Sequence, residues 1–222
     1  MAVLPYCILF AKSRTGIPAK GVRGSEIQQL TEGSLAALYS QLDKSEISAQ
    51  TFRHAALEFH DVVHSMFQHV AVVPFRFPTW LSESELAEHL REELARYQDF
   101  LSHHADHVQM EIRIALATGE ASNSASTGTE HLRQRASQLR ELQTVKEKLK
   151  QSLSAEVIEW RERELPSGLR VYALVERNRV PGFREKLSGQ GSRLSHSGPW
   201  PAMEFLNNQS HHGNTETRRT EE

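Results

Sequence analysis

The first part of the chain changes its hydrophobic pattern twice. Residues 4–11 are almost uniformly apolar, which predicts a buried strand. Residues 25–40 contain two short segments that flank Thr31-Glu32-Gly33, where Gly33 can take the positive φ of a tight turn. The pattern therefore predicts a strand followed by a β-hairpin.

Two later segments repeat apolar residues at intervals of three and four, the spacing of an amphipathic helix. Between residues 49 and 69 the apolar positions are Phe52, Ala56, Phe59, Val63, Met66 and Phe67. Between residues 83 and 103 they are Leu86, Leu90, Leu94, Tyr97 and Leu101. Ser82 and Glu85 have the spacing of a capping box, so we expect the second helix to begin at Glu83 and to continue to about His103.

Four other segments have the composition or the alternation of strands. Residues 70–77 are β-branched and aromatic, and residues 108–116 alternate apolar with polar side chains as a half-buried strand does. Residues 169–176 form a further apolar segment, Pro181 opens a short helix after it, and residues 192–205 complete a closing strand and turn. This order of helices and strands predicts an α+β fold.

A long segment, residues 130–165, contains neither proline nor glycine. It predicts a single helix of roughly 50 Å, at about 1.5 Å per residue. Its apolar positions are spaced by three, four or seven residues: Leu132, Leu139, Leu142, Leu149, Leu153, Val157 and Trp160. Such a narrow apolar face, interrupted by Lys146, favours contact with one partner helix, in this chain or in another.

The length of the chain and its polar segments predict how it is divided. At 222 residues it is long enough for one large domain or two small ones, and we expect two. Residues 117–129 are rich in Gly, Ser and Thr, which predicts a flexible linker. Residues 207–222 contain no apolar side chain and predict a disordered tail.

Charge and composition argue against several classes of partner. The 26 basic and 28 acidic residues give a formal net charge of −2, which provides no general attraction for nucleic acid or anionic lipid. Cys7 is the only cysteine, so an intrachain disulfide and a thiolate metal cluster are excluded. The apolar N-terminal segment lacks the flanking residues of a signal peptide, and no segment reaches the roughly 18 to 20 apolar residues of a membrane span. We therefore expect a soluble, cytoplasmic protein without a membrane partner.

The twelve histidines raise the hypothesis of a metal site. His60 with His64, and His103 with His107, have helical i, i+4 spacing. A catalytic zinc site needs a third ligand and a general base, and the chain contains no His-Glu-x-x-His sequence. We expect these to be surface or core histidines, and a metal-dependent enzyme or sensor stays open as an alternative. Cys7 lies in an apolar strand, where a thiol is more often inert packing than a nucleophile.

Two short blocks are more distinctive, VVPFRFPT at residues 72–79 and SGPWPAMEF at residues 197–205. They resemble the two signature blocks of the GvpF/GvpL gas vesicle protein family. The residues that match the family pattern are Pro74, Arg76, Phe77, Thr79, Gly198, Pro199, Trp200, Pro201 and Phe205. Weaker matches lie between the blocks in the family's order, so the resemblance spans residues 6–206. Pro78, where the family has glycine, and residues 202–204 depart from the pattern.

The resemblance implies an α+β protein of two domains, an N-terminal mixed α/β domain over residues 1–105 and a C-terminal ferredoxin-like domain over residues 106–206 with a long helical arm. It also implies a non-enzymatic accessory protein of gas vesicle assembly, cytoplasmic and vesicle-associated. Such a protein binds the small hydrophobic shell protein GvpA and other accessory proteins, without a cofactor. A repurposed interaction module in a host without gas vesicles is a further alternative.

Within the two blocks, we expect mainly structural roles. A Gly-Pro-Trp-Pro segment cannot lie inside a helix, because each proline lacks an amide donor. We expect Trp200 to be a core residue that packs the chain end against a helix, with a partner-binding ring as the alternative. We expect Arg76 to be a structural charge that ties the two domains together, with ligand binding as the alternative.

Overall fold

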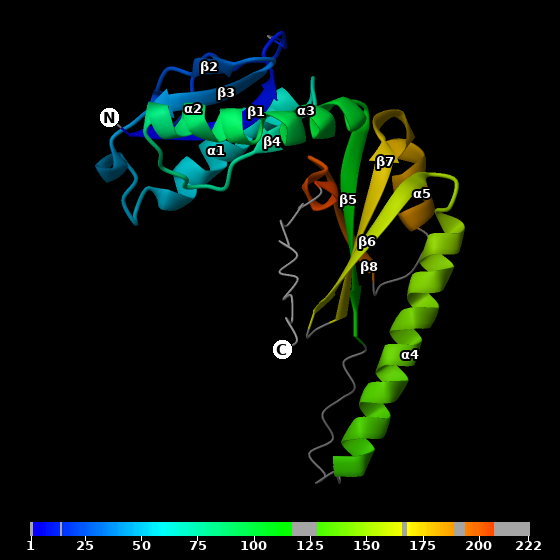
Figure 1. The fold of residues 1–222 in the computed structure, drawn as a ribbon. Helices are drawn as coiled ribbons and strands as arrows, with labels where there is room; N and C mark the ends of the chain where they lie inside the picture. The colour runs from blue at the N-terminus through cyan, green and yellow to red at the C-terminus, as the bar shows by residue number, and fades with distance from the viewer. Residues whose placement is uncertain (1, 14, 117–127, 166–167, 189–193, 207–222) are drawn as a thin grey trace, which may run out of the picture.

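The computed structural model describes residues 2–13, 15–116, 128–165, 168–188 and 194–206, and for residues 128–132 and 134 only the backbone. Thirteen α-helices and strands are found in this part of the chain. In order they are β1 (Val3–Phe10), β2 (Gln28–Glu32), β3 (Leu35–Gln41), α1 (Phe52–Phe67), β4 (Val73–Pro74), α2 (Glu83–Glu92), α3 (Leu94–His103), β5 (His107–Ala115), α4 (Gly128–Ser152), β6 (Val157–Leu165), β7 (Gly168–Glu176), α5 (Val180–Ser188) and β8 (Leu194–Trp200). The fold is α+β, as predicted (Figure 1).

The first sheet has the strand order β2-β3-β1-β4, with antiparallel pairing throughout. It lies between α1 on one face and α2 with α3 on the other. The residues of β1 are divided between the two cores, with a register shift between Pro5 and Cys7: Leu4, Tyr6, Cys7 and Leu9 pack with α1, and Val3 and Ile8 pack with α2 and α3. Burial on both faces explains why this segment is uniformly apolar.

The predicted hairpin and capping box are both confirmed. Gly33 has a φ of 58° in the turn between β2 and β3. Ser82 accepts a hydrogen bond from the Glu85 backbone, and the Glu85 carboxylate accepts one from the Ser82 backbone. The prediction of one helix over residues 83–103 is wrong, because Glu93 has non-helical dihedral angles. The break lets α2 pack on β2 and β3 while α3 packs on β1 and β3.

The strand predicted at residues 70–77 is much shorter than expected. Only Val73 and Pro74 pair with β1, opposite Ile8 and Cys7. Proline has no amide hydrogen for a ladder, which explains why β4 is a short strand at the edge of the sheet.

The second sheet has the order β6-β7-β5-β8, again antiparallel throughout. The chain order β5-α4-β6-β7-α5-β8 is the β-α-β-β-α-β order of a ferredoxin-like motif. Side chains from α4 and α5 share a core with one face of this sheet: Leu142, Leu149, Leu153, Phe183 and Leu187. The N-terminal part of α4 extends beyond the strands (Figure 1).

The single helix predicted over residues 130–165 is wrong. The helix ends at Ser152, and Val157–Leu165 is strand β6, which pairs along its length with β7. Side chains of β6 alternate between faces, so Glu162 reaches Lys146 and Lys150 on α4 while Arg163 reaches Glu204 on the other face. The apolar positions Leu142, Leu149 and Leu153 pack on the chain's own sheet rather than on a partner helix.

Two of the predicted segments fall wholly or mainly outside the described residues. The predicted linker over residues 117–129 lies there up to residue 127, and its last two residues belong to α4, so that end of the prediction is wrong. The predicted tail over residues 207–222 lies entirely outside the description.

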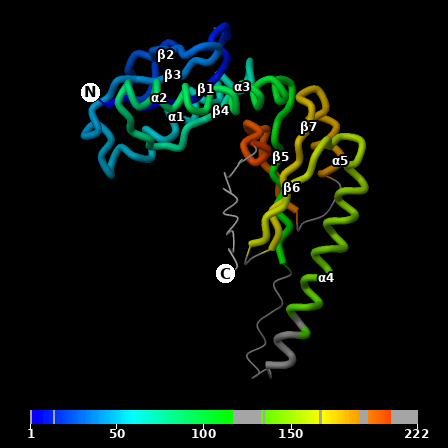
Figure 2. Tube along the Cα trace, viewed as in Figure 1, coloured from blue at the N-terminus to red at the C-terminus, as the bar shows by residue number. Residues whose placement is uncertain are grey.

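The two sheets are joined by the three residues between α3 and β5 (Figure 2). They also share a core. Tyr172 and Leu174 from β7 pack in one cluster with Tyr97, Phe100 and Leu101 from α3. The division at residues 105 and 106 into two domains is retained as a proposal. No helix in the described residues is long and apolar enough to cross a membrane.

Candidate functional site

The segment that follows β4 lines a hollow of about 340 Å³, which we call the Arg76 hollow. Its lining comes from β1, β4, α2, α3 and the segment between β4 and α2, and includes Ile8, Val73, Arg76, Leu81, His89 and Tyr97. Ile8 and Val73 are almost fully buried, whereas Arg76 is exposed. The hollow therefore combines an apolar surface with one exposed cation.

Three of the four residues predicted from the first block, Pro74, Arg76 and Thr79, line this hollow together. Thr79 Oγ1 donates a hydrogen bond to the Arg76 carbonyl at 2.6 Å, which stabilises the turn after Arg76. Phe77 packs elsewhere, with its ring centre 5.2 Å from that of Phe59 and 5.3 Å from that of Phe52 on α1. The block therefore contributes to both faces of the first sheet.

Two helix residues supply the polar part of the hollow besides Arg76 and Thr79. The Tyr97 hydroxyl lies 3.1 Å from His89 Nε2, and the His89 ring lies 5.7 Å from the ring of Phe75. Burial raises the pKa of Tyr97, and the nearby Glu93 carboxylate raises it further. Tyr97 therefore keeps its proton at neutral pH, and its hydroxyl can donate a hydrogen bond to His89 Nε2 when that nitrogen carries no hydrogen.

The expectation that Arg76 ties the two halves of the molecule together is wrong. Within the described residues its guanidinium group has no hydrogen bond or ion pair, and it is exposed. That role belongs to Arg177, directly after β7. Its guanidinium lies 4.4 Å from the ring centre of Phe67 on α1 and donates a hydrogen bond to the Val70 carbonyl at 3.5 Å. Nothing in the local sequence distinguishes Arg177, because both contacts are more than 100 residues away along the chain.

The second block closes the second sheet against β5. Gly198 has a φ of 118°, and a Cβ atom there would lie 2.9 Å from the carbonyl oxygen of Gln109. Only glycine fits both the dihedral angle and this approach. The Gly198 carbonyl accepts a hydrogen bond from Arg184 on α5 at 2.6 Å. Pro199 follows it in β8, and the Pro201 carbonyl accepts the Met203 amide at 2.7 Å.

Trp200 is not the core residue that we expected. It is 37% exposed, and its Nε1 donates to Ser197 Oγ at 3.2 Å. Its ring does meet a helix, with its centre 5.9 Å from that of His60 on α1. Phe205, only 3% exposed, is the aromatic residue that packs the chain end into the core, and the Arg161 guanidinium lies 5.1 Å from its ring centre. The Arg76 hollow is not lined by any residue of this second block.

The histidine pairs do not form a metal site in the described part of the chain, where no three His, Cys, Asp or Glu side chains are placed to hold an ion. The His60 and His64 rings stack with their centres 5.7 Å apart. His103 ends α3 and His107 begins β5, so the helical spacing assumed for that pair is wrong. Cys7 is buried, which raises the pKa of its thiol to about 12 and makes it a poor nucleophile at neutral pH.

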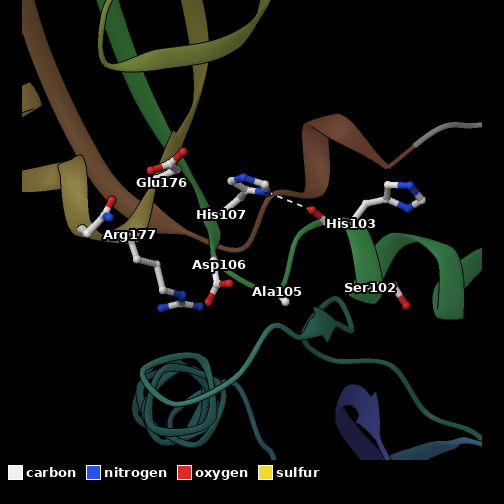
Figure 3. A pocket seen from close by; sticks show the side chains of 8 residues that line it. Ser102, His103, Ala105, Asp106, His107, Glu176 and Arg177 are labelled. Atoms are coloured by element: carbon white, nitrogen blue, oxygen red, sulfur yellow. Dashed lines mark hydrogen bonds between the residues drawn. The ribbon is translucent and has the colours of Figure 1, made fainter.

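A second hollow, of about 390 Å³, lies where α3 passes into β5 beside the end of β7. It is lined by Ser102, His103, Asp106, His107, Glu176 and Arg177. Figure 3 shows the charged ends of Asp106 and Arg177 pointing the same way, while His107 Nδ1 hydrogen-bonds the His103 carbonyl at 2.8 Å. Next to it, burial lowers the pKa of His104, and His107 and His103 lower it further. We find no convergence of a nucleophile with a general base in these lining residues.

Comparison with known proteins connects this fold to one family. The family model described as gas vesicle synthesis protein GvpL/GvpF matches residues 2–207. The structure is similar to the crystal structure of the gas vesicle protein GvpF from Anabaena sp. PCC7120, with a TM-score of 0.76 and 12% identity over 95% of this chain and 98% of that one. It is also similar to GvpF from Microcystis aeruginosa, with a TM-score of 0.71 and 14% identity over 92% and 98% of the two chains. A comparison with curated proteins found no match.

Proposed function

Since the chain belongs to the gas vesicle GvpL/GvpF family, we propose that it is a non-enzymatic accessory protein of gas vesicle assembly, cytoplasmic and vesicle-associated. Its partners in this proposal are the vesicle shell protein and other accessory proteins. The observation that carries the proposal is the match of the family model to residues 2–207, almost the whole chain.

The surface of α1 next to β8 is the region that we propose for the shell protein. Leu57 is 55% exposed on α1, and His60, three residues later, lies on the same side of that helix. The exposed ring of Trp200 lies against His60 and extends this region onto β8. We call Leu57, His60 and Trp200 together the α1–β8 surface.

The physical basis of such a contact is the hydrophobic effect. A small protein that polymerises into a gas-tight wall exposes apolar surface before assembly, and such surface aggregates unless it is covered. Covering Leu57 and Trp200 on this side would bury the corresponding apolar surface on both partners. An aromatic ring such as that of Trp200 contributes a large contact area for a small loss of side-chain entropy.

Co-expression with the shell protein tests this proposal. We expect the affinity-tagged chain to retain the shell protein in the soluble fraction and to co-purify with it. Leu57→Ser should reduce the amount captured at least several-fold. Leu139→Ser is the matched control, because Leu139 is a 49% exposed leucine on a different helix, and it should capture as much as the wild type. If the wild-type chain captures no shell protein, or if stoichiometric metal is found in the purified protein, the proposal is wrong.

A further inference from the structure

The Arg76 hollow has the size and the lining of a small binding site. Its volume of about 340 Å³ lies at the lower end of the range found for ligand pockets, about 300 to 1,000 Å³. Pro74, Phe75 and Leu81 are partly exposed and provide apolar surface above the buried Ile8 and Val73. The turn that carries the Arg76 guanidinium is held by the hydrogen bond from Thr79 to the Arg76 carbonyl. The space suits one large apolar side chain with a charged neighbour.

The charge of the hollow is positive. None of its lining residues is acidic, and Arg76 is the arginine among them. Within the described residues no carboxylate pairs with Arg76, so the guanidinium can offer its five N–H donors to a ligand. A planar guanidinium binds a carboxylate through two parallel hydrogen bonds, which fixes the orientation of the group as well as its position.

The hollow lies at the edge of the first sheet, where a segment of a partner chain can reach it. It adjoins β4, which is the edge strand of the first sheet in the part of the chain that the structure describes. β4 contains only Val73 and Pro74, and proline has no amide hydrogen, so a partner segment would be held here mainly through its side chains rather than by strand pairing. The hydrogen-bonded pair of His89 and Tyr97 places further polar groups beside such a segment.

We propose that the Arg76 hollow binds a partner segment in which a large apolar residue lies next to an acidic one, with the apolar side chain against Phe75 and Leu81 and the carboxylate on Arg76. The inference rests on the proposed function in one respect, namely that the ligand is a polypeptide. It assigns a second contact site, separate from the α1–β8 surface, to this chain.

Fluorescence anisotropy with a labelled peptide tests the site directly. The probe is the heptapeptide Gly-Ser-Leu-Glu-Leu-Ser-Gly, blocked at both ends and titrated with the full chain at low ionic strength. Two matched peptides replace the glutamate by glutamine or both leucines by serine. We expect saturable binding of the probe, at least tenfold weaker binding of each matched peptide, and weaker binding of the probe at high salt.

Two arginine variants decide whether the carboxylate meets Arg76. Arg76→Gln should weaken binding of the probe at least tenfold. Arg53→Gln, which changes an exposed arginine on a different element, helix α1, should leave the binding unchanged. Both variants should melt at the wild-type temperature, because both side chains are exposed. Equal binding by Arg76→Gln and the wild type, no preference for glutamate over glutamine, or no binding at all overturns the inference. Capture of the shell protein by the wild-type chain is scored separately, so a failure of the proposed function is distinguishable from a failure of the hollow.

Discussion

Phe205 and Trp200 lie in the same closing segment, yet the structure predicts very different costs for removing them. Phe205 is 3% exposed in a cluster with Tyr97 and Phe100, so Phe205→Ala leaves a cavity in a packed core. Such a truncation costs about 3 to 5 kcal/mol of the free energy of unfolding. The loss of the contact between Arg161 and the ring lies within this range.

Trp200 is 37% exposed and forms two weak contacts. The ring contact with His60 is of the kind worth about 0.5 to 1.5 kcal/mol, and the hydrogen bond to Ser197 is worth about 1 kcal/mol. These two contacts together amount to at most about 2.5 kcal/mol, so Trp200→Ala should lower the free energy of unfolding by less than Phe205→Ala does.

Thermal unfolding followed by circular dichroism separates the two variants. At about 2 to 4 °C per kcal/mol for a protein of this size, we expect Tm to fall by about 6 to 20 °C in Phe205→Ala and by no more than about 10 °C in Trp200→Ala. Urea titrations of the same variants give the free energies directly. A Trp200→Ala protein that loses as much stability as Phe205→Ala would refute the assignment of Phe205 as the residue that holds the chain end.

Three further predictions concern other parts of the fold. Gly198→Ala should lower the free energy of unfolding by at least about 1 to 3 kcal/mol in a urea titration, because alanine is strained at a φ of 118° and its Cβ meets the Gln109 carbonyl. Gly24→Ala should lower it less, because Gly24 also has a positive φ but has open space around it. Burial raises the pKa of the Cys7 thiol to about 12, so Cys7 should resist iodoacetamide at pH 8 in the folded protein. It should react in roughly 8 M urea, where the chain is unfolded. Rapid labelling of the native protein would contradict its burial. The pKa of His104 is lowered in the folded protein, so as pH falls through the ordinary value of 6.5 the unfolded chain binds a proton at this residue before the folded one does. The wild type should therefore lose more stability than His104→Gln between pH 7.5 and pH 5.5, about one unit on each side of that value. Equal losses in the two proteins would show that His104 does not contribute.

The elements that depend on local pattern were predictable from the sequence. The uniformly apolar β1, the hairpin turn at Gly33 and the capping box at Ser82 each follow from side chains within a few residues of one another. The alternation of β5 was visible in the same way, because one of its faces is buried and the other carries Glu111 and Arg113. Local rules suffice where the structure obeys them without a distant partner.

The sequence pattern alone predicts the wrong secondary structure for segments whose conformation depends on residues far away along the chain. Six of the nine residues of β6 are Glu, Arg or Leu, which are good helix formers. Leu149, Leu153, Val157 and Trp160 also continue the helical spacing, so the local pattern favours one long helix. The strand forms because β7 pairs with it, and pairing between strands is not visible in one segment alone. The break at Glu93 likewise reflects the different strands on which α2 and α3 pack.

The same distinction applies to the candidate site. The sequence identified the block around Arg76 but not the hollow, because Ile8, His89 and Tyr97 reach it from three other elements. From the sequence, Arg76 is expected to connect the two halves of the molecule, which Arg177 does in the structure. The contacts of Arg177 with Phe67 and Val70 exist only once the two sheets are packed together. The prolines next to Trp200 favour its burial in the core, whereas Phe205 is the aromatic residue that is buried there.

We propose that this chain acts by binding other gas vesicle proteins, with the α1–β8 surface against the shell protein. The most direct measurement replaces Leu57 by the photoreactive residue p-benzoylphenylalanine in cells that co-express the shell protein. We expect a covalent adduct of the chain with the shell protein on irradiation, and no adduct when the photoreactive residue replaces Leu139 instead. Equal adduct at both positions, or none at Leu57, would contradict the proposal.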